Sequence, residues 1–329
     1  MSKNLKEAFG SYLNKMKKKA VIISLSGFKL TKKEITIFKK YLPWGVILFT
    51  RNIKNIEQTL KLTSSIRKIF NDKKYPILID QEGGRVNRLK NIISFENLNS
   101  EYFGKKYLKN INEFKFFYKL FIDKTSFLLK SIGANINTSP VLDLKVKGAS
   151  NIIGDRSFSK DPKIVSKIGD YCIKYFHEYG IGTVMKHIPG HGLAKVDSHN
   201  FTPNINKSIE YLNNKDFFTF KNKKTFFAMT AHIVFNKIDN KNPVTHSKKM
   251  IKLIRNKIGF KNIVISDDLS MKSLKGNLKD NTIKTFKAGC NIALHCNGNF
   301  KEMLIVGKNS PLANKFLIKK TSQFYKILS

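Results

Sequence analysis

Eight short apolar runs, with helix-like segments between them, constrain the fold of this 329-residue chain more than any other feature. The runs are Ala20–Leu25, Gly45–Phe49, Ile77–Ile79, Ala134–Ile136, Thr183–Met185, Phe226–Met229, Val264–Ile265 and Ile292–Leu294. The segments between them repeat apolar residues at helical spacing, as Val165, Ile168 and Cys172 do. Alternation of strands and helices indicates a parallel sheet with right-handed crossovers. Eight such units predict an α/β fold, a (β/α)8 TIM-type barrel.

The domain organisation follows from what the chain lacks. It has no internal repeat, no low-complexity linker and no Pro/Ser-rich boundary. Its length would allow two domains, but α/β barrels of this size occur as one. We therefore predict a single domain over residues 1–329, with a barrel core at about 20–297 and a helical segment at 298–329 that closes the barrel.

The N-terminal region has a superficial likeness to a secretory signal, because Lys17–Lys19 precede the apolar run Ala20–Leu25. The run is short, contains Ser24, and is followed by no small-residue cleavage site. The capping-box pair Thr31 and Glu34 instead predicts that a helix follows a first strand. Three cysteines without repeated spacing argue against a disulfide framework, and no run is long enough to span a bilayer. We predict a cytoplasmic protein without membrane insertion.

The charge of the chain is strongly positive, with 61 lysine and arginine residues against 23 aspartate and glutamate residues and a net charge of +38. A basic face is the usual footprint of nucleic-acid binding. Here the lysines are spread along the whole chain and are not interleaved with aromatic residues as in a base-stacking surface. We favour a solvated lysine coat over a specific nucleic-acid site. Weak adhesion to anionic surfaces at low salt follows in either case.

Polar residues follow seven of the eight runs directly. They include Arg51 and Asn52, Asp80, Asn137, Lys186 and His187, His232, Asp267 and Asp268, and Asn297. The carboxyl ends of the strands of a parallel barrel meet at one face, where the active sites of such enzymes lie. The sequence therefore predicts that these side chains share one pocket.

The segment Lys186–His199 (KHIPGHGLAKVDSH) is too polar for a core and too rich in glycine and proline for a helix, so we expect a loop. His187 and His191 are four residues apart, a spacing that suits zinc on a helix. Pro189 lies between them and interrupts any helical face, so we favour a site without metal and predict no cofactor. We assign His191 only a structural role in the loop.

Three motifs together carry a family resemblance. They are Ile79–Arg88 (IDQEGGRVNR), Lys186–His199 and Val264–Lys272 (VISDDLSMK), with smaller matches at Leu48–Asn52, Pro140–Asp143 and Asn151–Phe158. In this order the set resembles glycoside hydrolase family 3, specifically its single-domain β-N-acetylglucosaminidases of the bacterial cell-wall recycling type. The likeness runs from about Ala20 to about Asn297.

The resemblance implies that Asp267 is the catalytic nucleophile, which forms a covalent glycosyl-enzyme intermediate in a retaining mechanism. Without the other motifs, a cap on the following helix would be the favoured interpretation of Asp267. Asp268 is expected to point elsewhere because neighbours on a strand alternate faces. The resemblance further implies that His199 is the general acid/base and that Asp197 orients it. An imidazole titrates near neutrality and can both donate and accept the proton.

Sugar contacts are also carried over from the family, residue by residue. The resemblance implies substrate binding by Asp80, Arg88, Arg156, Lys186 and His187. For the two arginines, structural salt bridges are the alternative interpretation. Gly83 and Gly84 are expected to allow a tight turn close to the ligand.

Two further residues, Asn52 and His232, are weaker candidates for sugar contacts. Each is as well explained by a buried hydrogen-bonding role. Ile188 and Asn291 depart from the family, which often has phenylalanine and aspartate there.

The predicted function is a retaining exo-β-N-acetylglucosaminidase that releases terminal β-linked N-acetylglucosamine from peptidoglycan-derived muropeptides. Its partner is then a small carbohydrate, and we expect a monomer that binds no specific nucleic acid. The alternatives are a phosphorylase or another glycosidase of the same family, and an inactive relative that binds sugar or nucleic acid.

Overall fold

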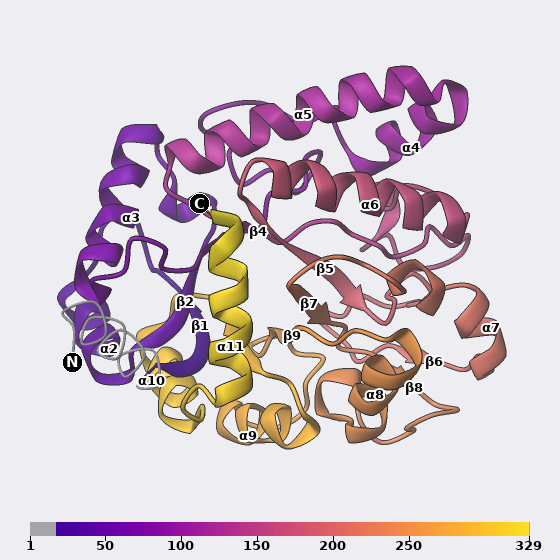
Figure 1. Ribbon diagram of the computed structural model, residues 1–329. Coiled ribbons are helices and arrows are strands. Elements are labelled where there is room, and N and C mark those ends of the chain that lie inside the picture. Colours follow the sequence, from indigo (N-terminus) through magenta and orange to yellow (C-terminus); the bar gives the residue numbers. More distant parts are fainter. Residues whose placement is uncertain (1–17, 329) are drawn as a thin grey trace, which may run out of the picture.

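All eight predicted strands are present in the computed structural model, which describes residues 18–328, and they close into a parallel barrel (Figure 1). The barrel strands are β1 (Lys19–Ser24), β2 (Pro43–Leu48), β3 (Ile77–Ile79), β4 (Ile136–Asn137), β5 (Gly182–Ile188), β7 (Phe227–Thr230), β9 (Ile263–Asp268) and β10 (Ile292–His295). Each strand pairs with the next in this order, and β10 pairs with β1. The predicted TIM-type barrel is confirmed.

The strand boundaries differ from the predicted ones mainly at the carboxyl ends. β5 continues through Lys186 and His187, and β9 continues through Asp267 and Asp268. Neighbouring strands hold these polar residues in the sheet, since Lys186 is in register with Met229 of β7. Two further strands that the sequence did not predict, β6 (Asn204–Ile205) and β8 (Val234–Phe235), pair with each other outside the barrel.

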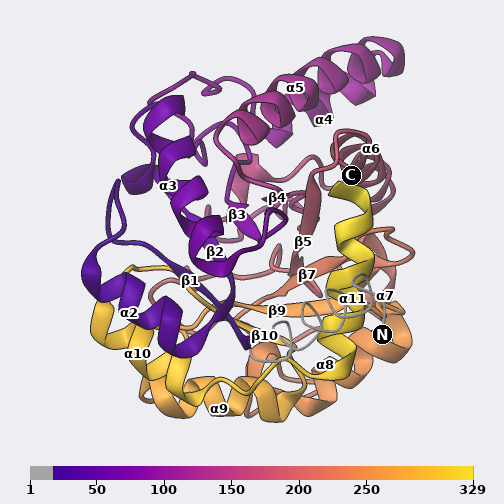
Figure 2. The ribbon, with the colours of Figure 1, turned by 60° about the vertical axis from the view of Figure 1, so that its left-hand side comes forward.

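Helices surround the barrel on its outside (Figure 2). They are α2 (Lys32–Tyr41), α3 (Ile56–Phe70), α4 (Ser100–Lys109), α5 (Ile111–Ser131), α6 (Pro162–Glu178), α7 (Ile209–Asn214), α8 (Lys248–Leu253), α9 (Leu278–Ala288), α10 (Phe300–Asn309) and α11 (Lys315–Phe324). The predicted capping box is present at α2, where the Glu34 amide donates to Thr31 Oγ1 (3.2 Å) and the Thr31 amide donates to Glu34 Oε2 (2.7 Å). Two backbone donors of the helix end are thereby satisfied.

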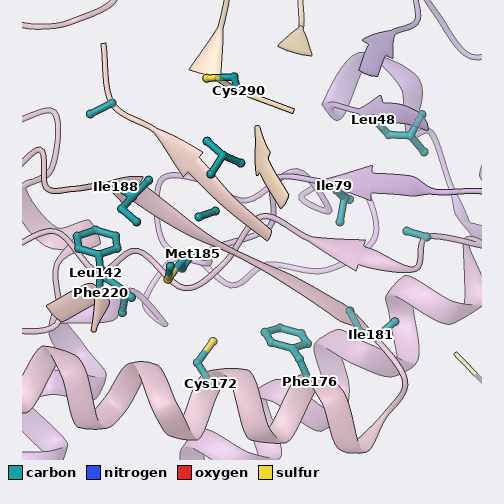
Figure 3. Close-up of a cluster of buried hydrophobic side chains, with 14 of the residues drawn as sticks. Leu48, Ile79, Leu142, Cys172, Phe176, Ile181, Met185, Ile188, Phe220 and Cys290 are labelled. Carbon is teal, nitrogen blue, oxygen red and sulfur yellow. The ribbon is translucent and has the colours of Figure 1, made fainter. Parts of the chain in front are cut away.

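The larger of the two apolar cores fills the space between the strands and the helices. In α6 the buried residues recur every three or four positions, so Cys172 and Phe176 point toward β5 and lie near Ile181 and Met185 (Figure 3). Ile188, where relatives often have phenylalanine, is fully buried in the same core. As expected, this departure from the family concerns packing.

The smaller core lies inside the barrel and is closed at the amino-terminal ends of the strands by α11. Trp44 and Phe227 from the strands pack with Leu317 and Phe324 from the helix. The Trp44 indole donates to Thr321 Oγ1 at 2.8 Å, so its buried N–H is satisfied. The carboxyl-terminal segment is thus helical and closes the barrel as predicted, whereas the domain limits, including the division near residue 297, stay a prediction.

Within residues 18–328, no helix combines the length and the apolar character needed to cross a bilayer. Lys17, which entered the comparison with a secretory signal, lies outside the described residues.

The closure by α11 predicts a large effect of Phe324→Ala. The ring is fully buried, with its centroid 5.0 Å from that of Phe227. Removing it should lower the free energy of unfolding in urea by about 3–5 kcal/mol. The matched control Phe316→Ala, in the exposed part of the same helix, should cost less than about 1 kcal/mol. Equal losses would contradict the packing described here.

Candidate active site

A cavity of about 360 Å³ opens at the carboxyl ends of the barrel strands, where the polar residues were expected to meet. Its lining includes seven of the eight predicted site residues, which are Asp80, Arg88, Arg156, Lys186, His187, His199 and Asp267. The eighth, Asp197, contacts His199 instead of lining the cavity. The volume is within the range of small-ligand pockets.

One wall of the cavity is a network of three cations and two carboxylates. Asp80 accepts hydrogen bonds from Thr138 Oγ1 (2.6 Å), Arg88 Nη2 (2.8 Å) and Lys186 Nζ. Its neighbour in the network is Glu82, which lies 2.5 Å from the same ammonium. Arg156 holds Glu82 through two parallel bonds of 2.8 Å each. Both arginines are therefore in salt bridges and also line the cavity, so the two interpretations offered for them are compatible.

This network keeps both carboxylates ionised although Glu82 is buried and Asp80 is largely buried. Burial alone would raise the pKa of Asp80, but the charges of Lys186 and Arg88 hold that pKa well below its usual range. Burial likewise opposes ionisation of Glu82, and Arg156 and Lys186 outweigh it, so its pKa is lowered. An ionised Asp80 can accept hydrogen bonds from two hydroxyl groups of a bound sugar.

His187 is oriented by a fully buried carboxylate, that of Asp143. The His187 amide lies 3.2 Å from both oxygens of Asp143, and its Nδ1 lies 2.7 Å from Oδ2. Burial would raise the pKa of Asp143, but His187 lowers it by charge and hydrogen bonding, so the carboxylate is ionised. The bond to Nδ1 fixes the ring, and no residue in the range 18–328 hydrogen-bonds Nε2.

Asp267 is the penultimate residue of β9 and lies half-buried at the cavity. Its Oδ1 accepts a hydrogen bond of 2.8 Å from the Asp268 amide. Burial would raise the pKa of Asp267, but nearby His187 and His232, that amide and Lys186 together lower it. The ionised carboxylate is chemically suited to attack an electrophilic carbon.

The alternative role of capping the following turn belongs to Asp268. Its carboxylate accepts bonds from the Ser270 amide (3.1 Å), the Ser270 hydroxyl (2.6 Å) and the Cys296 amide (3.1 Å). The expectation that Asp268 points away from the pocket is wrong, because it also contributes to the lining. Pairing between β9 and β10 shifts register between Ile292 and Leu294, and strict alternation of faces is lost at such an irregularity.

Asp197 and His199 form the predicted pair on the loop after β5. Asp197 Oδ1 accepts from both the amide and Nδ1 of His199, at 2.8 Å each. Partial burial would raise the pKa of Asp197, but the bonds from His199 lower it. The His199 side chain is 60% exposed and lines the cavity, and its Nε2 is the ring nitrogen left to exchange a proton there.

His191 connects this pair to the buried part of the site. Its amide donates to Asp143 Oδ1 at 2.7 Å, and its Nε2 lies 2.8 Å from the Ser198 hydroxyl, between the two residues of the pair. Burial lowers the pKa of His191 to about 4, so the ring is neutral at pH 7. These contacts are consistent with the structural role expected for His191, which also lines the cavity.

Glycines shape the turn after β3 as expected. Gly83 has a φ of +95°, and a Cβ added there would lie 2.3 Å from the Leu98 carbonyl oxygen. Gly84 has a φ of +56° and similarly close neighbours. Any other residue would be strained at either position.

Three residues of the site received no role from sequence reasoning, namely Glu82, Thr138 and Asp143. Glu82 and Asp143 lie inside motifs that were recognised, but a motif does not say which distant cation or imidazole a carboxylate will contact. Their partners Arg156 and His187 are 74 and 44 positions away.

The weaker candidates lie outside the cavity lining. Asn52 donates to the carbonyl oxygens of Leu25 and Gly27 at 3.0 Å, which is a structural role. His232 is fully buried and bonds the Asp268 carbonyl oxygen through Nε2 (3.0 Å). Asn291 accepts from the Val264 amide (2.9 Å) at the beginning of β9, so its difference from the family does not alter the pocket.

A metal site was the alternative considered for the histidines of the loop. Among residues 18–328 no group of three or more His, Cys, Asp and Glu side chains has the arrangement of a metal site.

Asp216 packs against the loop after β5, since a Cβ added to Gly190 in that loop would lie 2.6 Å from the Asp216 Cβ. Neither carboxylate oxygen has a hydrogen-bond partner among the described residues, and burial, with the nearby Asp143 charge, raises the pKa of Asp216 to about 7. The folded state therefore keeps this proton to higher pH than the unfolded chain does. The contribution of Asp216 to the free energy of unfolding therefore falls as the pH rises from about 4 to about 7.

We therefore expect Asp216→Asn to gain stability relative to the wild-type protein as the pH rises. Between pH 5 and pH 8 the difference in free energy of unfolding should change by about 2–3 kcal/mol in favour of the variant. Urea unfolding at several pH values measures it. A difference that does not vary with pH would mean that Asp216 titrates normally.

Comparison with known proteins places these features in a family. Residues 14–316 match the protein family described as "Glycosyl hydrolase family 3 N terminal domain". The chain is 33% identical over 287 residues to the beta-hexosaminidase of Haemophilus influenzae, which covers 84% of this chain and 79% of that protein.

Solved structures agree with this assignment. The structure of NagZ from Neisseria gonorrhoeae in complex with N-trifluoroacetyl-D-glucosamine aligns with a TM-score of 0.83 and 27% identity, over 94% of this chain and 90% of that one. A structure of the same protein in complex with a zinc ion aligns with a TM-score of 0.82, the same identity and the same coverage. The chain therefore belongs to glycosyl hydrolase family 3, as its motifs predicted, and is a glycoside hydrolase.

Proposed function

We propose that the protein is a retaining exo-β-N-acetylglucosaminidase with Asp267 as nucleophile. The observation that carries the proposal is an ionised Asp267 that lines the same cavity as His199, whose Nδ1 is bonded to Asp197. One group can attack the anomeric carbon while the other transfers a proton to the leaving oxygen. The names of the relatives point to hexosaminides as substrates.

In the first step the terminal sugar is held by Asp80, Arg88, Arg156, Lys186 and His187. A carboxylate oxygen of Asp267 forms a bond to the anomeric carbon while His199 Nε2–H protonates the departing glycosidic oxygen. The bond between that carbon and oxygen breaks, which leaves a glycosyl-aspartate. Asp197 stabilises the imidazolium before the proton leaves and keeps the ring in the required tautomer.

In the second step His199 accepts a proton from water as the water oxygen attacks the same carbon. The ester bond to Asp267 breaks and the carboxylate is regenerated. Two displacements on opposite faces restore the β configuration. The protein needs no cofactor in this scheme.

The cavity volume suits one terminal sugar, which favours removal of single residues from a chain end. Arg51 and Arg85 line the cavity in addition to the sugar-binding cations, so an anionic aglycone would be attracted. Muropeptides, namely N-acetylglucosaminyl-anhydro-N-acetylmuramic acid with or without peptide, have that character. We propose these as the natural substrates, acted on by a monomer in the cytoplasm, where three free cysteines would stay reduced.

The reaction class is tested with initial rates on p-nitrophenyl β-N-acetylglucosaminide beside the β-glucoside. We expect preference for the acetylated sugar, with rates unchanged by EDTA, by added zinc and by phosphate. Phosphate-dependent turnover would identify a phosphorylase, and loss with EDTA would reveal a metal requirement. If neither glycoside were hydrolysed, the protein would be a sugar-binding protein without catalytic activity.

The role of His199 predicts that His199→Ala depends on the leaving group. On substrates with poor leaving groups kcat/KM should fall by about 10²–10⁴, while a dinitrophenyl glycoside, which needs little protonation, should lose far less. Asp267→Ala should abolish turnover of both. If His199→Ala slowed both equally, His199 would not be the general acid.

A further inference from the structure

The outward face of α5 carries a stripe of large apolar side chains. Phe116, Leu120 and Phe127 are 66%, 56% and 61% exposed. Their spacing of four and seven residues places them on one line along the helix, which we call the α5 ridge. The opposite face is buried and includes Phe114, Tyr118, Phe121 and Leu128. The helix is therefore apolar on two sides, and only one of them has a partner within the described chain.

Exposed apolar side chains are concentrated in this part of the molecule. Of the sixteen large apolar side chains exposed among the described residues, seven belong to the α4–α5 hairpin. These seven are Tyr102, Leu108, Ile111, Phe116, Phe117, Leu120 and Phe127. Both views place α5 at the outer edge of the molecule, away from α9 and α10 (Figures 1 and 2). Concentrated exposed apolar surface of this kind marks interaction sites.

The same hairpin is basic. Residues 100–131 contain seven lysines and three acidic residues, so their net charge is +4 (7 − 3). Each acidic side chain is already paired with a lysine, as Glu113 is with Lys106 (3.1 Å) and Asp123 with Lys119 (3.0 Å).

Some of the lysines of the hairpin are free to meet a partner. Lys109, Lys124 and Lys130 are exposed and form no ion pair within residues 18–328. Lys124 also lies near the ridge, with its Nζ 5.8 Å from the centre of the Phe127 ring.

We propose that the α4–α5 face docks the enzyme on the surface of an anionic lipid bilayer. The ridge enters the boundary between headgroups and acyl chains, and the flanking lysines contact lipid phosphates. Free lysines beside an apolar stripe fit a flat layer of phosphates over hydrocarbon. A protein partner would have to supply an apolar groove edged with carboxylates.

Docking is peripheral and leaves the active site open. The inner face of α5 packs in the apolar core, so the helix lies along the surface and does not insert. None of the ridge residues lines the catalytic cavity. The enzyme can therefore bind lipid and hydrolyse substrate at the same time.

The test is co-sedimentation of the full chain with vesicles of phosphatidylcholine alone or mixed with phosphatidylglycerol. We expect binding to the mixed vesicles only, weakened by salt. Replacing the ridge by Phe116→Ser, Leu120→Ser and Phe127→Ser should lower the partition coefficient at least tenfold. The matched control Leu60→Ser, Ile305→Ser and Leu312→Ser removes exposed apolar side chains elsewhere at unchanged charge and should lower it less than twofold.

A second measurement does not depend on whether the triple variant folds. Phe116→Trp places an indole on the ridge, and its fluorescence should shift to the blue with the mixed vesicles and not with phosphatidylcholine. An unchanged partition coefficient in the ridge variant, or an unshifted indole, would mean that the lysine coat alone binds anionic lipid and would overturn the proposal. Equal loss in both triple variants would also overturn it, because the effect would not be specific to the ridge. So would ridge-dependent self-association in sedimentation velocity without vesicle binding, because the ridge would then be an interface between two copies of the chain.

Discussion

The Lys186 ammonium, buried between Asp80 and Glu82, is the interaction on which the rest of the pocket depends. Two buried carboxylates so close together would otherwise repel each other, and one would take up a proton. Lys186, helped by Arg88 and Arg156, removes this conflict and leaves both ionised. Loss of one partner from a buried ion pair typically costs about 3–5 kcal/mol, because the remaining charge is left uncompensated. The extension of β5 through Lys186 is therefore a requirement of the site as well as a feature of the barrel.

A further buried carboxylate, that of Asp143, connects the rigid barrel to the exposed loop. It fixes the His187 ring directly and holds the His191 amide, and His191 in turn contacts Ser198. Asp143, His191 and Ser198 are thus all buried, and only His199 at the end of this series is largely exposed. The order suits the chemistry, since a sugar-binding group must be held still, whereas an acid/base must exchange protons with water.

The sequence predicted the barrel because eight apolar runs separated by helical spacing permit few other folds. It also predicted that the polar residues after the strands would meet, since parallel strands end at one face. It could not predict that β5 and β9 would continue through charged residues, because pairing with β7 and β10 decides this and those strands are distant in the sequence. β6 and β8, with two residues each, are too short to leave a periodic signal. The resemblance supplied the site residues but left Glu82 and Asp143 without roles, since their partners are set by the fold.

Arg88 and Arg156 show that an arginine can form a structural salt bridge and remain available to contact a ligand at the same time. Arg88 and Arg156 are fixed by Asp80 and Glu82, which stops them from moving when the cavity is empty, and their remaining surface still faces the cavity. Three cations against two carboxylates also leave this wall with one excess positive charge. Such fixed cations can select an anionic ligand, because no side-chain entropy is lost when it binds. The lysines of the outer surface differ in this respect. Those without a carboxylate partner remain mobile side chains that attract any anionic surface. Whether a cation is paired with a carboxylate, and not how many cations the sequence contains, therefore determines what its charge can do.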